Sequence, residues 1–292
     1  MSVADLFKAD FEATINPYPE FPVTMMSSDL ARAIGDLPPL LRVRPRSALD
    51  VGTGSGLHAS ALAVAGIQEI DAVDIAAPAV AAAQRRFFRL RPQLDRLAGT
   101  AVPAPRFTVC DMEAADLRKP YDLIVANPPS FFPARATEVP DTPITRALFD
   151  GDRRQADNVE NSFLYRLFAR CSRGLLADGG TIICTWPAIE ARLTSSRSRN
   201  LVHPLDLLSK WFGWQFGTSY ESAEAFFRKS AQVRGYGSDD RLVNMVAEDA
   251  RRTRMYSETL AFPEPDVMIF RYGILCIEHV RDQAGHFRII NI

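Results

Sequence analysis

Short apolar runs alternate with segments of helical spacing through the middle of the chain. The runs are short enough to be buried strands, and they lie at 48–51, 69–74, 107–110, 121–126 and 181–186. The segments between them contain small residues or apolar residues at helical spacing, and they lie at 56–65, 78–90 and 161–176. Strands that alternate with helices predict an α/β fold with a mostly parallel sheet and helices on both faces.

The two ends of the chain follow other patterns. Prolines recur within 16–23, which predicts an extended arm leading to a helix that begins near Ser28. Helical stretches are predicted at 205–212 and 223–230, in a region rich in aromatic residues, and the final strands at 267–280 and 287–290. We therefore divide the chain into an N-terminal arm, helix and loop on the substrate side, a cofactor-binding core, a helical substrate-binding or lid insertion, and the last strands of the core sheet, with bounds 1–46, 47–187, 188–262 and 263–292. A Pro/Asp/Arg-rich loop at 133–160 is expected to lie over the site.

Composition narrows the class of protein. The 292 residues are 47% hydrophobic and carry 34 Lys and Arg against 35 Asp and Glu, which is unlike a strongly basic nucleic-acid binder. No apolar run approaches the length of a membrane span. The four cysteines lie far apart and form no C-x-x-C pair, and the four histidines lack metal-ligand spacing. We expect reduced core cysteines, a cytoplasmic protein, and no metal site or membrane partner.

Three glycines follow the first predicted strand, in the segment Asp50-Val51-Gly52-Thr53-Gly54-Ser55-Gly56. Glycine lets the backbone approach a ligand closely, so a turn of this kind between a strand and a helix can hold a cofactor. The dinucleotide fingerprint requires a further glycine three residues after Gly54, where this chain has Leu57. This spacing argues against a nicotinamide-dependent oxidoreductase.

Acidic residues stand at the ends of three successive predicted strands. Asp50 precedes the glycine-rich turn, Asp74 ends the second strand, and Asp111 follows the third. An acid about 20 residues beyond the turn, as Asp74 is, can accept hydrogen bonds from ribose hydroxyls. Each acid alone fits helix capping or loop solvation, but the three together indicate a cofactor site.

These motifs resemble those of the class I S-adenosylmethionine-dependent methyltransferases. The residues that carry the resemblance are Leu49 to Gly56, Val73-Asp74-Ile75, Cys110-Asp111-Met112 and Val125-Ala126-Asn127-Pro128-Pro129. The resemblance covers roughly 47–187 and implies a Rossmann-like seven-stranded sheet, with S-adenosylmethionine (SAM) across the carboxyl ends of the strands and S-adenosylhomocysteine (SAH) as product. It also implies methionine-moiety contacts at Asp50 and Gly52, ribose at Asp74 and adenine at Asp111, within a cofactor site formed by Asp50, Gly52, Thr53, Gly54, Gly56, Asp74, Ile75, Asp111, Met112 and Asn127.

Asn127-Pro128-Pro129 closes the fourth predicted strand. An asparagine side-chain oxygen and a proline-flanked carbonyl can each accept one N–H bond from a planar nitrogen, and two prolines stiffen the loop. Enzymes of the resembled subgroup methylate amide nitrogens or exocyclic base amines, and they usually carry an aromatic residue next. This chain has Ser130 there, followed by Phe131 and Phe132, so Phe131 is our candidate for stacking on the acceptor. The predicted catalytic residues are Asn127, Pro128, Pro129 and Phe131.

The acceptor is left open between two classes. A nitrogen of a small molecule, peptide or protein is favoured by the near-neutral charge, by Ser130 and by the aromatic region. An exocyclic base amine of RNA or DNA is the alternative, for which clusters of arginines such as Arg85, Arg86 and Arg89 could bind phosphates. A non-catalytic protein that kept the cofactor-binding fold is the second alternative.

Overall fold

The computed structural model describes residues 1–13, 25–112, 117, 120–128, 163–192, 202–217, 219–227, 229–233 and 267–292. The expected proline-rich arm at 16–23, the loop at 133–160, and the residues Pro129, Ser130, Phe131 and Phe132 lie outside these described residues.

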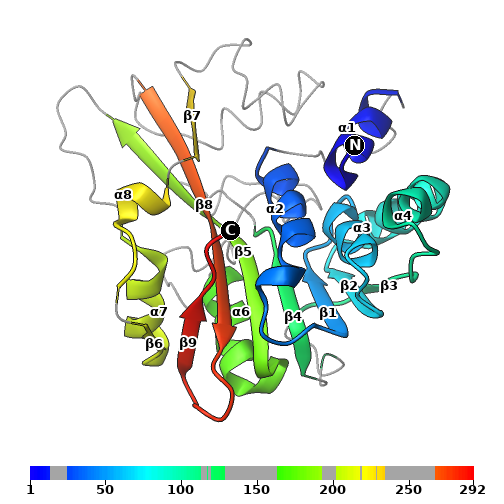
Figure 1. The fold of residues 1–292 in the computed structure, drawn as a ribbon. Coiled ribbons are helices and arrows are strands. Elements are labelled where there is room, and N and C mark those ends of the chain that lie inside the picture. The colour runs from blue at the N-terminus through cyan, green and yellow to red at the C-terminus, as the bar shows by residue number, and fades with distance from the viewer. Residues whose placement is uncertain are drawn as a thin grey trace.

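A single sheet forms the centre of the fold (Figure 1). Its strands are β1 Ser47–Val51, β2 Glu69–Asp74, β3 Arg106–Val109, β4 Tyr121–Ala126, β5 Leu176–Arg192, β6 Gln215–Phe216, β7 Lys229–Val233, β8 Val267–His279 and β9 His286–Ile289. The strand order is β3-β2-β1-β4-β5-β8-β9-β6, and β7 pairs with β8 beside this path. Strands β1 to β5 pair in parallel, whereas β8 runs antiparallel to β5, β7 and β9.

Helices cover both faces of the sheet (Figure 1). The helices are α1 Val3–Ala13, α2 Met25–Asp36, α3 Leu57–Val64, α4 Ala77–Ala98, α6 Phe163–Arg170, α7 Pro204–Phe212 and α8 Ala223–Phe226. Ala48, Val125 and Ile183 pack in one core with α1 to α4, and their strand neighbours Leu49 and Ile124 pack in a second core with α6 and α7. The period-two alternation along each strand separates these two cores. The predicted fold class, a mostly parallel α/β sheet with helices on both faces, is confirmed.

The number of strands and several bounds of helices and strands were predicted wrongly, because they depend on pairing between strands far apart in the sequence. In the described part of the chain the sheet has nine strands, where seven were expected, because the short β6 pairs with β9 and β7 pairs with β8. The helix expected at 223–230 ends at Phe226, and Lys229–Val233 is a strand. Strand β5 continues to Arg192, beyond the expected end of the core segment, because β8 pairs with it along its whole extension. The division of the chain into four segments remains a prediction.

Helix bounds differ for similar reasons. Helix α2 begins at Met25, so Ser28 lies inside it instead of capping it. Helix α4 continues through Pro92 to Ala98, because Leu94 is fully buried in the core beyond the proline. The helix expected at 161–176 is α6 followed by one π-helical turn, Cys171–Leu175, in which Gly174 has a φ of 98°. Helix α1 at the N-terminus was not predicted.

Neither a membrane-spanning helix nor a metal-binding cluster is found among the described residues. No helix in the described ranges is long and apolar enough to cross a bilayer. Within the same ranges, no three His, Cys, Asp or Glu side chains are grouped so as to hold a metal ion.

Candidate functional site

The glycine-rich turn between β1 and α3 has an unusual backbone. Gly52, Gly54 and Gly56 have φ angles of 74°, 47° and 80°, in the left-handed region that side chains disfavour. The amides of Gly52 and Thr53 both donate to the Val73 carbonyl at 2.9 Å, which holds the turn over the end of β2. A Cβ atom added to Gly52 would meet no atom within 4 Å, so there is open space beside this part of the turn.

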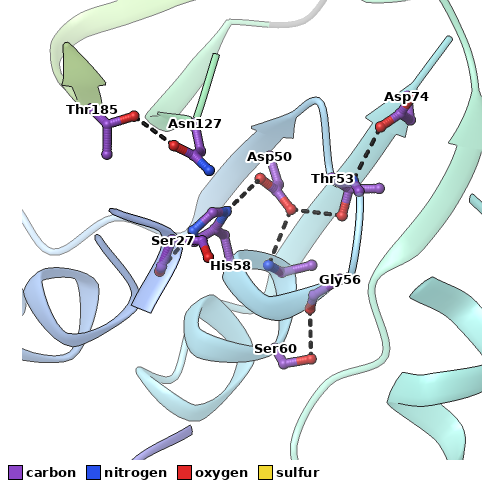
Figure 2. A network of polar contacts seen from close by, with 11 residues as sticks. Ser27, Asp50, Thr53, Gly56, His58, Ser60, Asp74, Asn127 and Thr185 are labelled. Atoms are coloured by element: carbon purple, nitrogen blue, oxygen red, sulfur yellow. Dashed lines mark hydrogen bonds and ion pairs between the residues drawn. The ribbon is translucent and has the colours of Figure 1, made fainter. Parts of the chain in front are cut away.

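The Asp50 carboxylate stabilises the turn from inside the protein (Figure 2). Its Oδ2 atom accepts hydrogen bonds from Thr53 Oγ1 at 2.7 Å and from the Ala59 amide at 3.1 Å. Asp50 is fully buried, and its Oδ1 atom has no hydrogen-bond partner in the described part of the chain. Burial raises the pKa of this carboxyl to about 7. The Oδ2 atom of Asp50 therefore connects the turn to α3, and its Oδ1 atom is a buried acceptor without a hydrogen bond in the described part of the chain.

His58 extends this network toward the N-terminal part of the chain. Its Nε2 atom lies 3.1 Å from the carbonyl oxygen of Ser27 in α2, and its Nδ1 atom lies 3.9 Å from Asp50 Oδ1. Burial lowers the pKa of His58 to about 4, so the ring is neutral near pH 7. A neutral ring that donates from Nε2 to Ser27 turns its Nδ1 lone pair toward Asp50. Sequence reasoning missed His58, although a histidine among the small residues of the first turn of α3 was a visible signal.

Asp74 joins the glycine-rich turn at the end of the neighbouring strand. Its Oδ2 atom accepts from the Gly54 amide at 3.0 Å, and its Oδ1 atom accepts from the Ala76 amide at 2.9 Å. Burial raises the pKa of Asp74 above its usual value. Ile75, next in the chain, is half exposed and offers an apolar surface beside this acid. Both carboxylate oxygens of Asp74 thus accept from backbone amides, and its contact with ribose stays a prediction.

The third acid lies farther along the same edge of the sheet. The Cys110 amide donates to the Asp74 carbonyl at 2.9 Å, which joins the end of β3 to the end of β2. Asp111 is exposed and Met112 is buried. The three predicted acids thus stand at the ends of three adjacent strands.

Asn127 follows β4 at this edge. The hydroxyl of Thr185, in β5, donates a hydrogen bond of 2.6 Å to Asn127 Oδ1 (Figure 2). Thr185 is fully buried, and Pro128 is buried as well. One of the two lone pairs of the Asn127 oxygen is therefore already used inside the protein. Thr185 was not predicted, since nothing near it in the sequence marks a contact to a residue 58 positions away.

The parts of this site lie together because parallel strands end at one edge. Val51 pairs with both Val73 and Ala126, so the residues that follow β1, β2 and β4 emerge side by side. In open α/β sheets, ligands generally bind at the carboxyl ends of the strands, which is where the glycine-rich turn and these acids lie. Asn127 adds a neutral hydrogen-bonding group next to that cradle.

Comparisons with known proteins point to a particular class. A family model described as ribosomal protein L11 methyltransferase (PrmA) matches residues 39–128, which include the glycine-rich turn and run to Pro128. This match agrees with the methyltransferase class that the sequence motifs indicate. A comparison with curated proteins finds no match.

Several solved structures resemble the chain at low identity. A ribosomal protein L11 methylase from Lactobacillus delbrueckii subsp. bulgaricus is 23% identical with a TM-score of 0.31, and the match covers 55% of this chain and 58% of that one. A SAM-dependent methyltransferase from Thiobacillus denitrificans, in complex with SAH, is 15% identical with a TM-score of 0.37 and coverages of 94% and 98%. YjhP from E. coli is 13% identical with a TM-score of 0.39 and coverages of 94% and 99%.

Proposed function

We propose that this chain is a SAM-dependent methyltransferase that transfers a methyl group to a planar nitrogen of a small-molecule, peptide or protein substrate. One observation carries the proposal: Val51 and Ala126 are paired, so Gly52 of the cofactor turn and Asn127 follow at matching positions on adjacent strands. Neighbouring strands lie about 4.8 Å apart, so a donor held at the turn is within reach of an acceptor held by Asn127.

The residues at the turn fit SAM. Open space beside Gly52 admits a ligand, and the unpartnered Oδ1 atom of Asp50 is a buried acceptor at the base of the turn. Asp74 is suited to ribose hydroxyls, and the half-exposed Ile75 offers an apolar contact for adenine. When bound, SAM supplies an electrophilic methyl group on a positively charged sulfur.

Asn127 would hold and orient the acceptor nitrogen. Its oxygen keeps one lone pair for an N–H group of the substrate, because Thr185 uses the other. The adjoining Pro128 restricts the backbone, so little entropy is lost when the acceptor is aligned. Because the methyl group is already activated, positioning and hydrogen bonding supply most of the acceleration, and no strong base is needed.

A protein acceptor has support from the family model, whose description names ribosomal protein L11. The amide and backbone groups of an Asn-Pro-Pro sequence suit an acceptor whose lone pair is delocalised, such as an amide or guanidine. The match over 39–128 and the chemistry of the Asn-Pro-Pro sequence together favour a nitrogen on a protein or peptide.

Calorimetry tests the cofactor. We expect SAM and SAH to bind and NAD to bind much more weakly, and we expect Asp74→Ala to weaken SAH binding about tenfold or more through loss of a charge-assisted hydrogen bond. Preferential NAD binding would defeat the methyltransferase assignment. Unaltered SAH affinity in Asp74→Ala would overturn the ribose role alone.

Radiolabelled methyl transfer identifies the acceptor class. Cell extract separated into protein, RNA and small-molecule fractions is incubated with the enzyme and methyl-labelled SAM. Label in the protein or small-molecule fraction supports the proposal. Label confined to RNA would assign the enzyme to base methylation instead.

A further inference from the structure

The hydroxyl of Thr185 is buried and forms a hydrogen bond with Asn127. Ala126 pairs with Cys184, so Asn127 and Thr185 follow at the same level on adjacent strands. Thr185 is fully buried, and among the described residues Asn127 is the hydrogen-bond partner of its hydroxyl. The bond from Thr185 Oγ1 to Asn127 Oδ1 is 2.6 Å long.

This bond selects one of the two orientations of the carboxamide. With Oδ1 toward Thr185, the hydroxyl proton is donated and the buried hydroxyl is satisfied. With the amide turned over, the NH₂ group would face Thr185 and the hydroxyl proton would need another acceptor. A buried hydroxyl without an acceptor disfavours that orientation by roughly ten- to a hundredfold.

The selected orientation decides what Asn127 presents to the site. Figure 2 shows Asn127 between Thr185 and Asp50, with its amide nitrogen turned away from Thr185. The NH₂ group of Asn127 and the second lone pair of its Oδ1 atom therefore remain available to a ligand. An acceptor nitrogen held by this group needs that lone pair in one fixed direction.

We infer that Thr185 is a positioning residue for the proposed methyl transfer, because its hydroxyl fixes the orientation of the Asn127 carboxamide. The inference rests on the proposed function and adds a residue to the same site. Thr185 acts through Asn127 and need not touch substrate or cofactor.

Two substitutions separate the hydroxyl from the bulk of the side chain. Thr185→Val keeps the shape and removes the hydroxyl, whereas Thr185→Ser keeps the hydroxyl and removes a methyl group. If Thr185 positions Asn127, Thr185→Val should impair activity more than Thr185→Ser does. If Thr185 only fills space, Thr185→Ser should be the more harmful substitution. We expect kcat to fall about ten- to a hundredfold in Thr185→Val, the size of effect that a small misplacement of reacting groups can cause.

The kinetic measurement uses the acceptor found by radiolabelling. Thr185→Val should lose kcat while its SAH dissociation constant stays within about twofold of the wild-type value. Thr185→Ser should keep kcat within about threefold, since it rescues the hydrogen bond. Equal losses in both variants, or full kcat in Thr185→Val, would refute the positioning role.

A second measurement needs no acceptor. In protein labelled with ¹⁵N-asparagine, the side-chain NH₂ resonances of Asn127 are assigned by their loss in Asn127→Ala. They should move or split in Thr185→Val, as the amide samples both orientations, and stay close to wild-type in Thr185→Ser. Unmoved resonances in Thr185→Val would overturn the inference. Failure of the wild-type protein to bind SAH would instead remove the proposed function, so the two failures are distinguishable.

Discussion

Asp50 and His58 impose opposite pH dependences on stability. The folded-state pKa of Asp50 is raised from 3.8 to about 7, so the folded protein binds this proton more readily and stability falls as pH rises through that window. The folded-state pKa of His58 is lowered from 6.5 to about 4, so stability falls as pH drops from 6.5 toward 4. The turn is thus supported by two buried groups that are both most stable uncharged.

Replacing Asp50 by asparagine tests the acid half of this balance. The new carboxamide can still accept from Thr53 and Ala59, and its NH₂ group can face the Nδ1 lone pair of His58. We expect Asp50→Asn to raise the free energy of unfolding of the ligand-free protein by about 2–4 kcal/mol at pH 8. Urea unfolding at pH 8 and pH 4.5 checks this, because most of the difference should disappear at the lower pH. The same gain at both pH values would show that ionisation of Asp50 is not its cause.

Asn127 is the residue whose loss should separate chemistry from cofactor binding. In Asn127→Ala the acceptor loses its hydrogen-bonding partner, so kcat/KM should fall about a hundredfold or more, as when one oriented donor or acceptor is removed from an active site. The dissociation constant of SAH should change little. Methyl-transfer kinetics and calorimetry measure the two effects. A large loss of SAH affinity would place this residue in the cofactor pocket instead.

At the scale of elements, Gly56 sets how closely α3 approaches α4. A Cβ atom at Gly56 would lie 2.9 Å from the Cβ atom of Ala83, and the φ of 80° disfavours any side chain. We expect Gly56→Ala to lower the free energy of unfolding by about 2–4 kcal/mol, combining backbone strain with overpacking. Gly99→Ala is the matched control, since Gly99 has a φ of 70° but open space for a Cβ atom. Urea unfolding of both variants isolates the packing effect, and equal losses would contradict it.

Elements whose pattern is decided locally could be predicted from the sequence. Strands β1, β2 and β4 lie where apolar runs predicted them, because each run is buried on both faces. Strand β7 and the extension of β5 depend on pairing with β8, which begins dozens of residues beyond either. Local spacing cannot report such pairing, and the helix predicted over 223–230 therefore overlapped the first residues of β7, Lys229 and Ser230. The predicted helix 78–90 is also too short, because the buried Leu94 holds α4 in place beyond Pro92.

The same division holds within the site. Asp50, Asp74 and Asn127 could be found because they lie at the ends of predicted strands. His58 lies near Asp50 and is itself hydrogen-bonded to Ser27 in α2, and Thr185 in β5 donates to Asn127. These contacts arise only when the sheet and α2 are assembled. The sequence therefore predicts the groups that can face a ligand better than it predicts the groups that orient them.

At the scale of the whole molecule, helix α1 is linked to the glycine-rich turn through Arg86 in α4. Asp10 in α1 lies 3.3 Å from Arg86 Nε and 2.6 Å from Arg89 Nη2, both in α4. Arg86 is buried and donates from Nη1 to the Ser55 carbonyl at 3.1 Å, and its guanidinium lies 5.8 Å from the ring centroid of Phe7. Helices α1 and α4 and the turn thus converge on one buried cation.

Removing the charge of Asp10 should show how much its ion pairs with Arg86 and Arg89 contribute to the stability of the protein. Asp10→Asn leaves the buried Arg86 without its counter-ion, and breaking one partner of a buried pair is costly even where the pair itself adds little. We expect the free energy of unfolding to fall by about 2–4 kcal/mol, with a weaker SAH affinity, because the Ser55 carbonyl lies in the turn that Arg86 supports. Asp36→Asn, at the exposed end of α2, is the control and should stay within about 0.5 kcal/mol of wild-type. Urea unfolding with and without SAH measures both effects. If Asp10→Asn proved as stable as the control, the charge of Asp10 would not help to hold Arg86, and α1 would contact this guanidinium through Phe7 without an energetically important ion pair.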